Sequence, residues 1–226
     1  MTIVNDMDKN NIYDIKHIET SNIEILEKQL NNIFNRPNYT CKPATKKELQ
    51  DIIYERIKKE GNNCDLNDIN VSGITDMSCL FGPYWLYQCN PNISKWDVSN
   101  VTNMERMFAG TSFNTDISCW DVSNVINMKY MFLCCSTFNQ DISNWNVSHV
   151  ENMIGMFDGC TNFNQDISKW NISNVKYIDF MFSDCINLTY DLSALVAPWA
   201  KTQYNSDITG MFYEVKAKLP AWYKQY

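Results

Sequence analysis

Four aspartates, one in each of four successive repeats, have the chemistry to bind a hard cation. Each stands before Ile or Leu and then Ser, at Asp116, Asp141, Asp166 and Asp191. If the repeats stack at the strand spacing of about 4.8 Å, the carboxylates form a column and repel one another. Calcium could offset that repulsion, with further oxygen ligands from Asn114, Asn139 and Asn164. The alternative is that each aspartate accepts amide hydrogen bonds within its own turn, with no metal.

Three cysteines recur with the same period, at Cys135, Cys160 and Cys185. The chain has nine cysteines but no Cys-x-x-Cys pair. The spacing predicts a column of small buried side chains, with disulfide bonding and metal binding as the alternatives.

Residue types suited to catalysis are sparse. The two histidines, His17 and His149, are far apart in the chain, and no P-loop or glycine-rich dinucleotide motif occurs among the seven glycines. We therefore expect no enzymatic activity and no cofactor.

The element that would position these columns is a repeated phrase of the form W-D-V-S-N-V-x-N-M-x-x-M-F. It begins at Trp96, Trp120, Trp145 and Trp170, which are 24, 25 and 25 residues apart. Weaker copies extend the repeat on both sides to about six units. A constant period of this length is typical of a solenoid, in which each repeat buries its apolar face against its neighbours.

Within one unit, Ile167, Trp170 and Ile172 have the spacing of the strand segment in leucine-rich repeats, L-x-x-L-x-L. The apolar residues that follow, Val175, Ile178, Met181 and Phe182, have helical spacing. The sequence thus predicts an α/β fold: a leucine-rich-repeat-like solenoid of about six strand–helix coils with an N-terminal helical cap.

Four segments are expected along the chain. Residues 1–44 form an N-terminal extension with one helix, over 21–36, and a linker. Residues 45–64 form the capping helix, whose start is marked by a capping box of Thr45 and Glu48. Residues 65–212 form the repeat solenoid, and residues 213–226 form a C-terminal lid.

Alternation along the predicted strands places polar residues on the open face of the solenoid. These residues are Lys95, Asp97, Ser99, Asp121, Ser123, Asn144, Asn146, Ser148, Lys169, Asn171 and Ser173. We expect this face to bind a protein partner, so that the chain is a non-enzymatic protein–protein interaction module. The alternatives are that these residues only solvate the sheet, or that the chain is an architectural, self-assembling component of a surface layer or virion.

Charge indicates what kind of partner to expect. Residues 1–63 hold ten basic and ten acidic residues, so the whole formal charge of −7 lies in the repeats and the C-terminus. An acidic domain repels nucleic acid and is complementary to a basic protein surface. The chain has no signal peptide at its start and no stretch of 18 apolar residues, so a cytoplasmic or virion-associated location is expected rather than secretion.

The repeated phrase, together with F-N-x-D-I-S before the next tryptophan, resembles the BspA-like leucine-rich repeat proteins. It is most similar to the branch with repeats of about 25 residues, which occurs in mycoplasma surface lipoproteins, AT-rich bacteria and large DNA viruses. The resemblance covers about residues 42–212. It implies a leucine-rich-repeat solenoid and a role in surface adhesion or host interaction.

Overall fold

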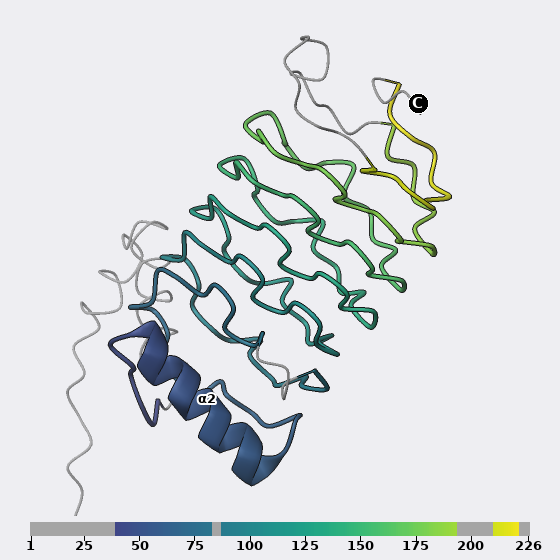
Figure 1. Cartoon of the computed structure of the whole chain (residues 1–226). Coiled ribbons are helices and arrows are strands. Elements are labelled where there is room, and N and C mark those ends of the chain that lie inside the picture. Colours follow the sequence, from purple (N-terminus) through teal and green to yellow (C-terminus); the bar gives the residue numbers. More distant parts are fainter. Residues whose placement is uncertain (1–38, 83–86, 194–209, 222–226) are drawn as a thin grey trace, which may run out of the picture. The chain divides into compact units, whose positions relative to one another are not determined.

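The structure, a computed structural model, describes residues 39–82, 87–193 and 210–221. These residues lie in the second of two compact units, Met1–Asn38 and Tyr39–Tyr226. The helix predicted over 21–36 falls in the first unit, outside the described residues. Within the second unit the chain winds through successive coils that lie side by side (Figure 1).

Helix α2, Lys46–Glu60, is the one helix among the described residues, and it runs beside the first coil (Figure 1). Leu49, Ile53 and Ile57 form its buried face. Its start carries the predicted capping residues: Thr45 Oγ1 accepts from the Glu48 amide at 3.2 Å. The Glu48 carboxylate accepts from the amide of Ala44 at 2.7 Å, one residue earlier than in a standard capping box.

Each coil consists of consecutive β-turns whose first and last residues are buried. In one coil the Trp96 amide donates to Ile93, the Val101 amide to Val98 and the Met107 amide to Met104. All six of these residues are in the core. One to three solvent-facing residues therefore alternate with one or two buried residues around the coil.

The predicted α/β fold of strand–helix coils with an N-terminal helical cap is wrong. Between residues 64 and 193 the described chain contains no helix and no strand, only isolated bridges such as Asn103↔Asn127 and Asn127↔Asn152. The segment predicted as strand bends at a turn closed by the bond from the Trp170 amide to Ile167, at 3.0 Å. The segment predicted as helix was misjudged because consecutive β-turns also place buried residues three apart, as at Ile178 and Met181.

Backbone hydrogen bonds between coils are concentrated in the segment predicted to be helical. The Tyr130 amide donates to Ile154 of the next coil at 2.8 Å, and the Phe132 amide donates to Met156 at 2.9 Å. Equivalent bonds join the other coils at the same place. The turn containing Tyr130 therefore forms part of a ladder that runs along the stack.

Aromatic rings fill the core in rows. Phe81, Phe108, Phe132, Phe157, Phe182 and Phe212 stack in order, with ring centroids 5.4–5.7 Å apart. The four tryptophans of the repeated phrase are each 4% exposed and so belong to the core. The core is thus one continuous column that no single coil could form alone.

Candidate functional site

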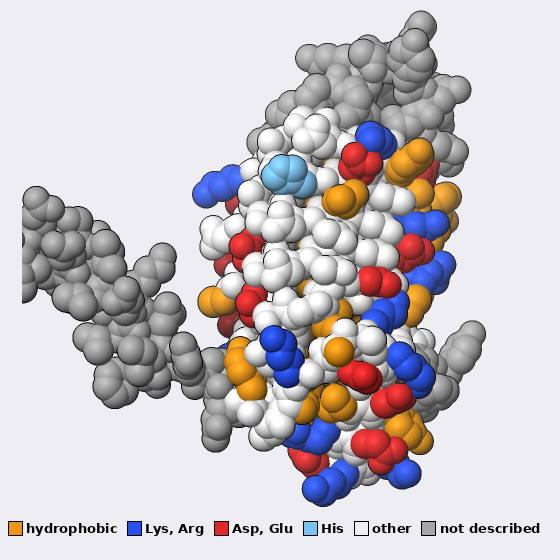
Figure 2. Space-filling view, turned by 90° about the vertical axis from the view of Figure 1, so that its left-hand side faces the viewer, with side chains coloured by type: hydrophobic (Ala, Val, Ile, Leu, Met, Phe, Trp, Pro, Cys, Tyr) orange, Lys and Arg blue, Asp and Glu red, His pale blue; other side chains and the backbone are white. Residues whose placement is uncertain are grey.

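The predicted binding residues all lie outside the core. Eight of the eleven are exposed, and Ser99, Ser123 and Ser148 are half-buried. We call the surface that these eleven residues form the Asx-turn face, because it lies on turns and not on strands. Figure 2 shows one long face of the stack, on which most side chains are neither charged nor hydrophobic.

In each coil, turns begin at an Asp or Asn whose side-chain oxygen accepts a hydrogen bond from the backbone amide of the residue two positions later. Asp97 Oδ1 accepts from the amide of Ser99 at 3.1 Å and from its hydroxyl at 2.6 Å. Asn146 makes the same amide bond to Ser148, at 3.2 Å. Such Asx turns replace backbone hydrogen bonding where the chain changes direction. The Asp and Ser of the repeated phrase therefore have a local structural role as well as an exposed position.

The aspartate column is built from the same turns. Asp116, Asp141 and Asp166 accept from the amides of Ser118, Ser143 and Ser168 at 2.9–3.0 Å. These hydrogen bonds lower the pKa of all three carboxyls. The neighbouring charge of Asp141 raises the pKa of Asp116, but by less than the hydrogen bonds lower it. Bonds from Ser193 and then Lys218 lower the pKa of Asp191 to about 2.

These carboxyls make stability depend on pH in a defined direction. Because their folded pKa lies below the ordinary value of 3.8, their contribution is fully present above pH 4 and is lost as the pH falls towards 2. Asp158 acts in the opposite sense, because burial raises its pKa.

We expect the urea midpoint of unfolding to fall steeply below pH 4. The Asp141→Asn/Asp166→Asn variant keeps both turn acceptors but loses two titrating groups, so its midpoint should fall less below pH 4 than the midpoint of the wild type. An equal fall in the two proteins would mean that these carboxyls do not cause the loss of stability in acid.

The alternative of a calcium column receives no support from this geometry. Each of the four aspartates has its own serine amide, and Asp191 also pairs with Lys218 at 2.9 Å. Across the part of the chain that the structure describes, no group of three or more His, Cys, Asp or Glu side chains could hold a metal ion.

The cysteine column is buried, and all nine cysteines of the chain are free thiols. Cys160 Sγ donates to the carbonyl of Phe132 at 2.9 Å, and Cys185 Sγ donates to Phe157 at 3.1 Å. Burial raises the pKa of each thiol in the column, to about 11 for Cys135. The column therefore joins neighbouring coils as neutral thiols.

Sequence reasoning missed a ladder of asparagines. The side chain of Asn90 accepts from the amide of Asn114 at 2.8 Å, Asn114 accepts from Asn139 at 2.8 Å, and Asn139 accepts from Asn164 at 2.9 Å. The signal was available in the Phe-Asn pairs at 113–114, 138–139 and 163–164, but the calcium hypothesis treated these asparagines as ligands.

Side chains also join the coils on the Asx-turn side. Trp145 Nε1 donates to Ile117 of the preceding coil at 3.2 Å, and Trp170 Nε1 donates to Ile142 at 3.1 Å. Asn124 Nδ2 donates to Ser99 at 2.8 Å, and His149 Nδ1 lies 2.8 Å from the equivalent carbonyl. Because that partner is a carbonyl, His149 carries its proton on Nδ1. His149 thus takes the place of the asparagine in this column of bonds between coils.

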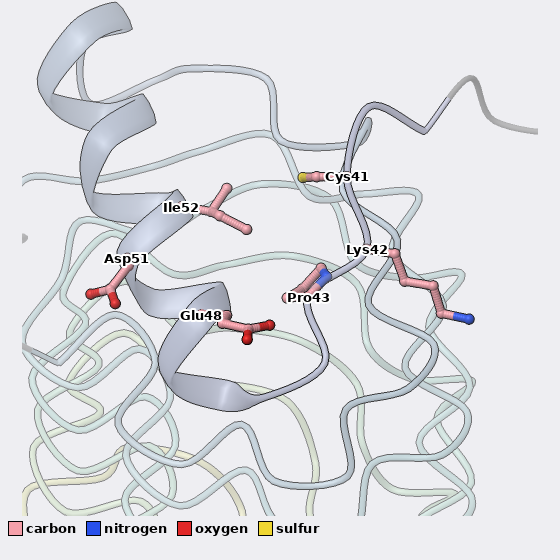
Figure 3. A pocket seen from close by; sticks show the side chains of 6 residues that line it. All are labelled: Cys41, Lys42, Pro43, Glu48, Asp51 and Ile52. Carbon is pink, nitrogen blue, oxygen red and sulfur yellow. The ribbon is translucent and has the colours of Figure 1, made fainter.

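A hollow of about 320 Å³ lies between the first turns of α2 and the segment that precedes it (Figure 3). It is lined by Cys41, Lys42, Pro43, Glu48, Asp51 and Ile52. Glu48 bonds to the backbone of Ala44, and Asp51 pairs with Lys47. Both carboxylates therefore already have partners within the chain, and the hollow has no free acidic group for a ligand.

The outer surface of the backbone ladder was also missed. We call it the ladder face: Thr102, Glu105, Arg106, Ile126, Lys129, Tyr130, Glu151, Ile154, Lys176, Asp179 and Phe180. On the Asx-turn face successive coils repeat nearly the same residues, whereas on the ladder face each coil carries different ones. The coils therefore adopt the same backbone at these positions with different side chains.

Two overlapping segments of the chain, residues 47–152 and 111–222, match the model of a family described as "Mycoplasma protein of unknown function, DUF285". Comparison with curated proteins and with solved structures gives no match. Among the described residues, no helix has both the length and the apolarity needed to cross a membrane.

Proposed function

Because the chain belongs to this Mycoplasma protein family of unknown function, its role has to be inferred from its own surface, and we propose that it is a non-enzymatic module that binds another protein through the Asx-turn face. The observation that carries the proposal is a set of exposed carboxylates held in one orientation. Asp97 and Asp121 each accept from the amide of the serine two residues later, at 3.1 and 3.0 Å.

The chemistry of these carboxylates favours a partner with a basic surface. Hydrogen bonds from Ser123 lower the pKa of Asp121, so this group is ionised at neutral pH. Neither Asp97 nor Asp121 forms a salt bridge within the described part of the chain. Fixed, unpaired charges steer association and lose little conformational freedom on binding.

The chain supplies its own isosteric test. Asn146 and Asn171 occupy the positions of Asp97 and Asp121 in the next coils and make the same turn bond, at 3.2 and 3.1 Å. The Asp97→Asn/Asp121→Asn variant should therefore fold normally while losing two charges from the face. We expect this variant to recover about tenfold less partner protein than the wild type, because unscreened charges at an interface raise association rates by about this factor or more.

Partner recovery is measured by affinity capture from source cells with quantitative mass spectrometry. The control is Glu55→Gln/Glu214→Gln, which removes two exposed carboxylates elsewhere. A protein recovered with the wild type and the control, but not with the Asp97→Asn/Asp121→Asn variant, supports the proposal. Equal recovery with all three proteins would move the binding site to another surface.

A narrower proposal rests on the repeated phrase. It places the chain among the BspA-like proteins, with surface adhesion or host interaction as its role. The competing role as a self-assembling component predicts discrete oligomers in a concentration series followed by light scattering, whereas the proposed module stays monomeric in the absence of its partner.

A further inference from the structure

One arginine on the ladder face lies over the face of an aromatic ring. The Arg106 guanidinium carbon lies 4.5 Å from the centroid of the Tyr130 ring, which belongs to the next coil. The ring in turn lies over the backbone of Gly155 in the coil after that, since a Cβ built on Gly155 would be 2.4 Å from Tyr130 Cε1. Three successive coils thus contribute the guanidinium, the ring and the flat surface below it.

The donors of this guanidinium are not used within the described residues. Arg106 has no side-chain hydrogen bond and no salt bridge there, and its neighbour Glu105 instead accepts from Asn127 Nδ2 at 3.2 Å. Lys129 Nζ lies 5.3 Å from the centroid of the same ring and is likewise without an ion pair in the described chain. Two free cations therefore flank one fixed ring in a chain whose formal charge is −7.

We propose that Arg106, Tyr130 and Lys129 form a carboxylate-binding site for an acidic segment of a partner protein. A guanidinium stacked on a ring presents its N–H groups edge-on, in the fork geometry that matches a carboxylate. Stacking also restricts the long arginine side chain before the ligand arrives, which reduces the entropy lost on binding. Lys129 adds a second positive charge beside the fork.

The surroundings of the site favour a protein segment over a polyphosphate or nucleic acid. The net negative charge of the chain repels a nucleic acid, which carries a charge at every nucleotide, more strongly than a peptide whose carboxylates are separated by uncharged residues. Two coils beyond Tyr130, Phe180 of the ladder face is 42% exposed and Tyr177, three residues before it, is 54% exposed, so an apolar side chain of the ligand has aromatic rings to contact. Aromatic residues and arginine are the types enriched where protein interfaces bind most strongly.

The test measures fluorescence anisotropy of a fluorescein-labelled glutamate-rich peptide and of its glutamine counterpart, at constant salt. We expect the wild type to bind the glutamate peptide and not the glutamine peptide. Arg106→Gln should weaken binding about tenfold, the effect of losing one charge-assisted hydrogen-bonded pair. Lys59→Gln, which removes one exposed cation from α2, outside both proposed binding surfaces, is the matched control and should change affinity less than about twofold.

Tyr130 is a positioning residue in this site, and its variants separate orientation from charge. Tyr130→Phe keeps the stacked ring and should retain affinity, whereas Tyr130→Leu should weaken binding although no charge is lost. Circular dichroism confirms folding of each variant. Three outcomes would overturn the proposal: no binding of the glutamate peptide to the wild type, equal losses for Arg106→Gln and Lys59→Gln, or tighter binding of a labelled oligonucleotide than of the peptide.

Discussion

Replacing Phe157 by alanine should lower the free energy of unfolding by about 4 kcal/mol, the usual cost of removing a fully buried ring. Its ring is at the centre of the core, with centroids of Phe132, Phe163 and Phe182 at 5.7, 4.2 and 5.7 Å. Because each coil contacts only its neighbours, the cavity would also separate the coils on either side. Urea unfolding followed by tryptophan fluorescence measures the loss.

The matched control for Phe157→Ala is Tyr177→Ala, which removes a ring that is 54% exposed and should cost less than about 1 kcal/mol. A second transition in the Phe157→Ala unfolding curve would show that the coils have uncoupled. A loss as small as that of Tyr177→Ala would mean that the phenylalanine column does not carry the stability of the stack.

Replacing Gly155 by alanine should cost about 2–4 kcal/mol, from two sources that can be separated. Gly155 has φ +54°, a left-handed conformation that costs a residue with a Cβ about 1 kcal/mol. In addition the new methyl group would lie 2.4 Å from the Tyr130 ring, which must move. Thermal and urea unfolding give the total.

Gly110→Ala isolates the conformational part, since Gly110 has φ +71° and nothing lies within 4 Å of its added Cβ. We expect about 1 kcal/mol for this variant. The steric part should vanish in the Tyr130→Ala/Gly155→Ala double variant, giving a favourable coupling energy in the double-mutant cycle. If Gly155→Ala and Gly110→Ala lower the free energy of unfolding by the same amount, the Tyr130 ring does not lie on Gly155.

The sequence was sufficient to predict which residues are buried and how often the pattern returns. The tryptophans, the cysteine column and the apolar residues at Ile178 and Met181 are in the core as expected. Burial follows from residue type and period, and neither depends on the local backbone conformation. Residue type and period also made it possible to name a turn-forming role as one of the two alternatives for the aspartate column.

The backbone conformation could not be predicted in the same way. A helix and a run of β-turns both bury residues three apart, and no residue between Val175 and Phe182 distinguishes them. Left-handed residues are the clearest difference, but only Gly155 and Gly210 give that signal, because the equivalent position in other coils holds Arg106, Tyr130 and Phe180. The contact of Arg106 with Tyr130 could not be predicted from the sequence either, because it depends on how two neighbouring coils are aligned.

The bonds from each tryptophan to the preceding coil have an evolutionary consequence. Each coil donates to the coil before it and accepts from the coil after it, through the same atoms at Trp120, Trp145 and Trp170. A duplicated or deleted block of 24 or 25 residues thus leaves two compatible surfaces in contact, with every donor matched to an acceptor. Unequal recombination between repeats can lengthen or shorten this protein by whole coils and so change the reach of its surface without a new fold.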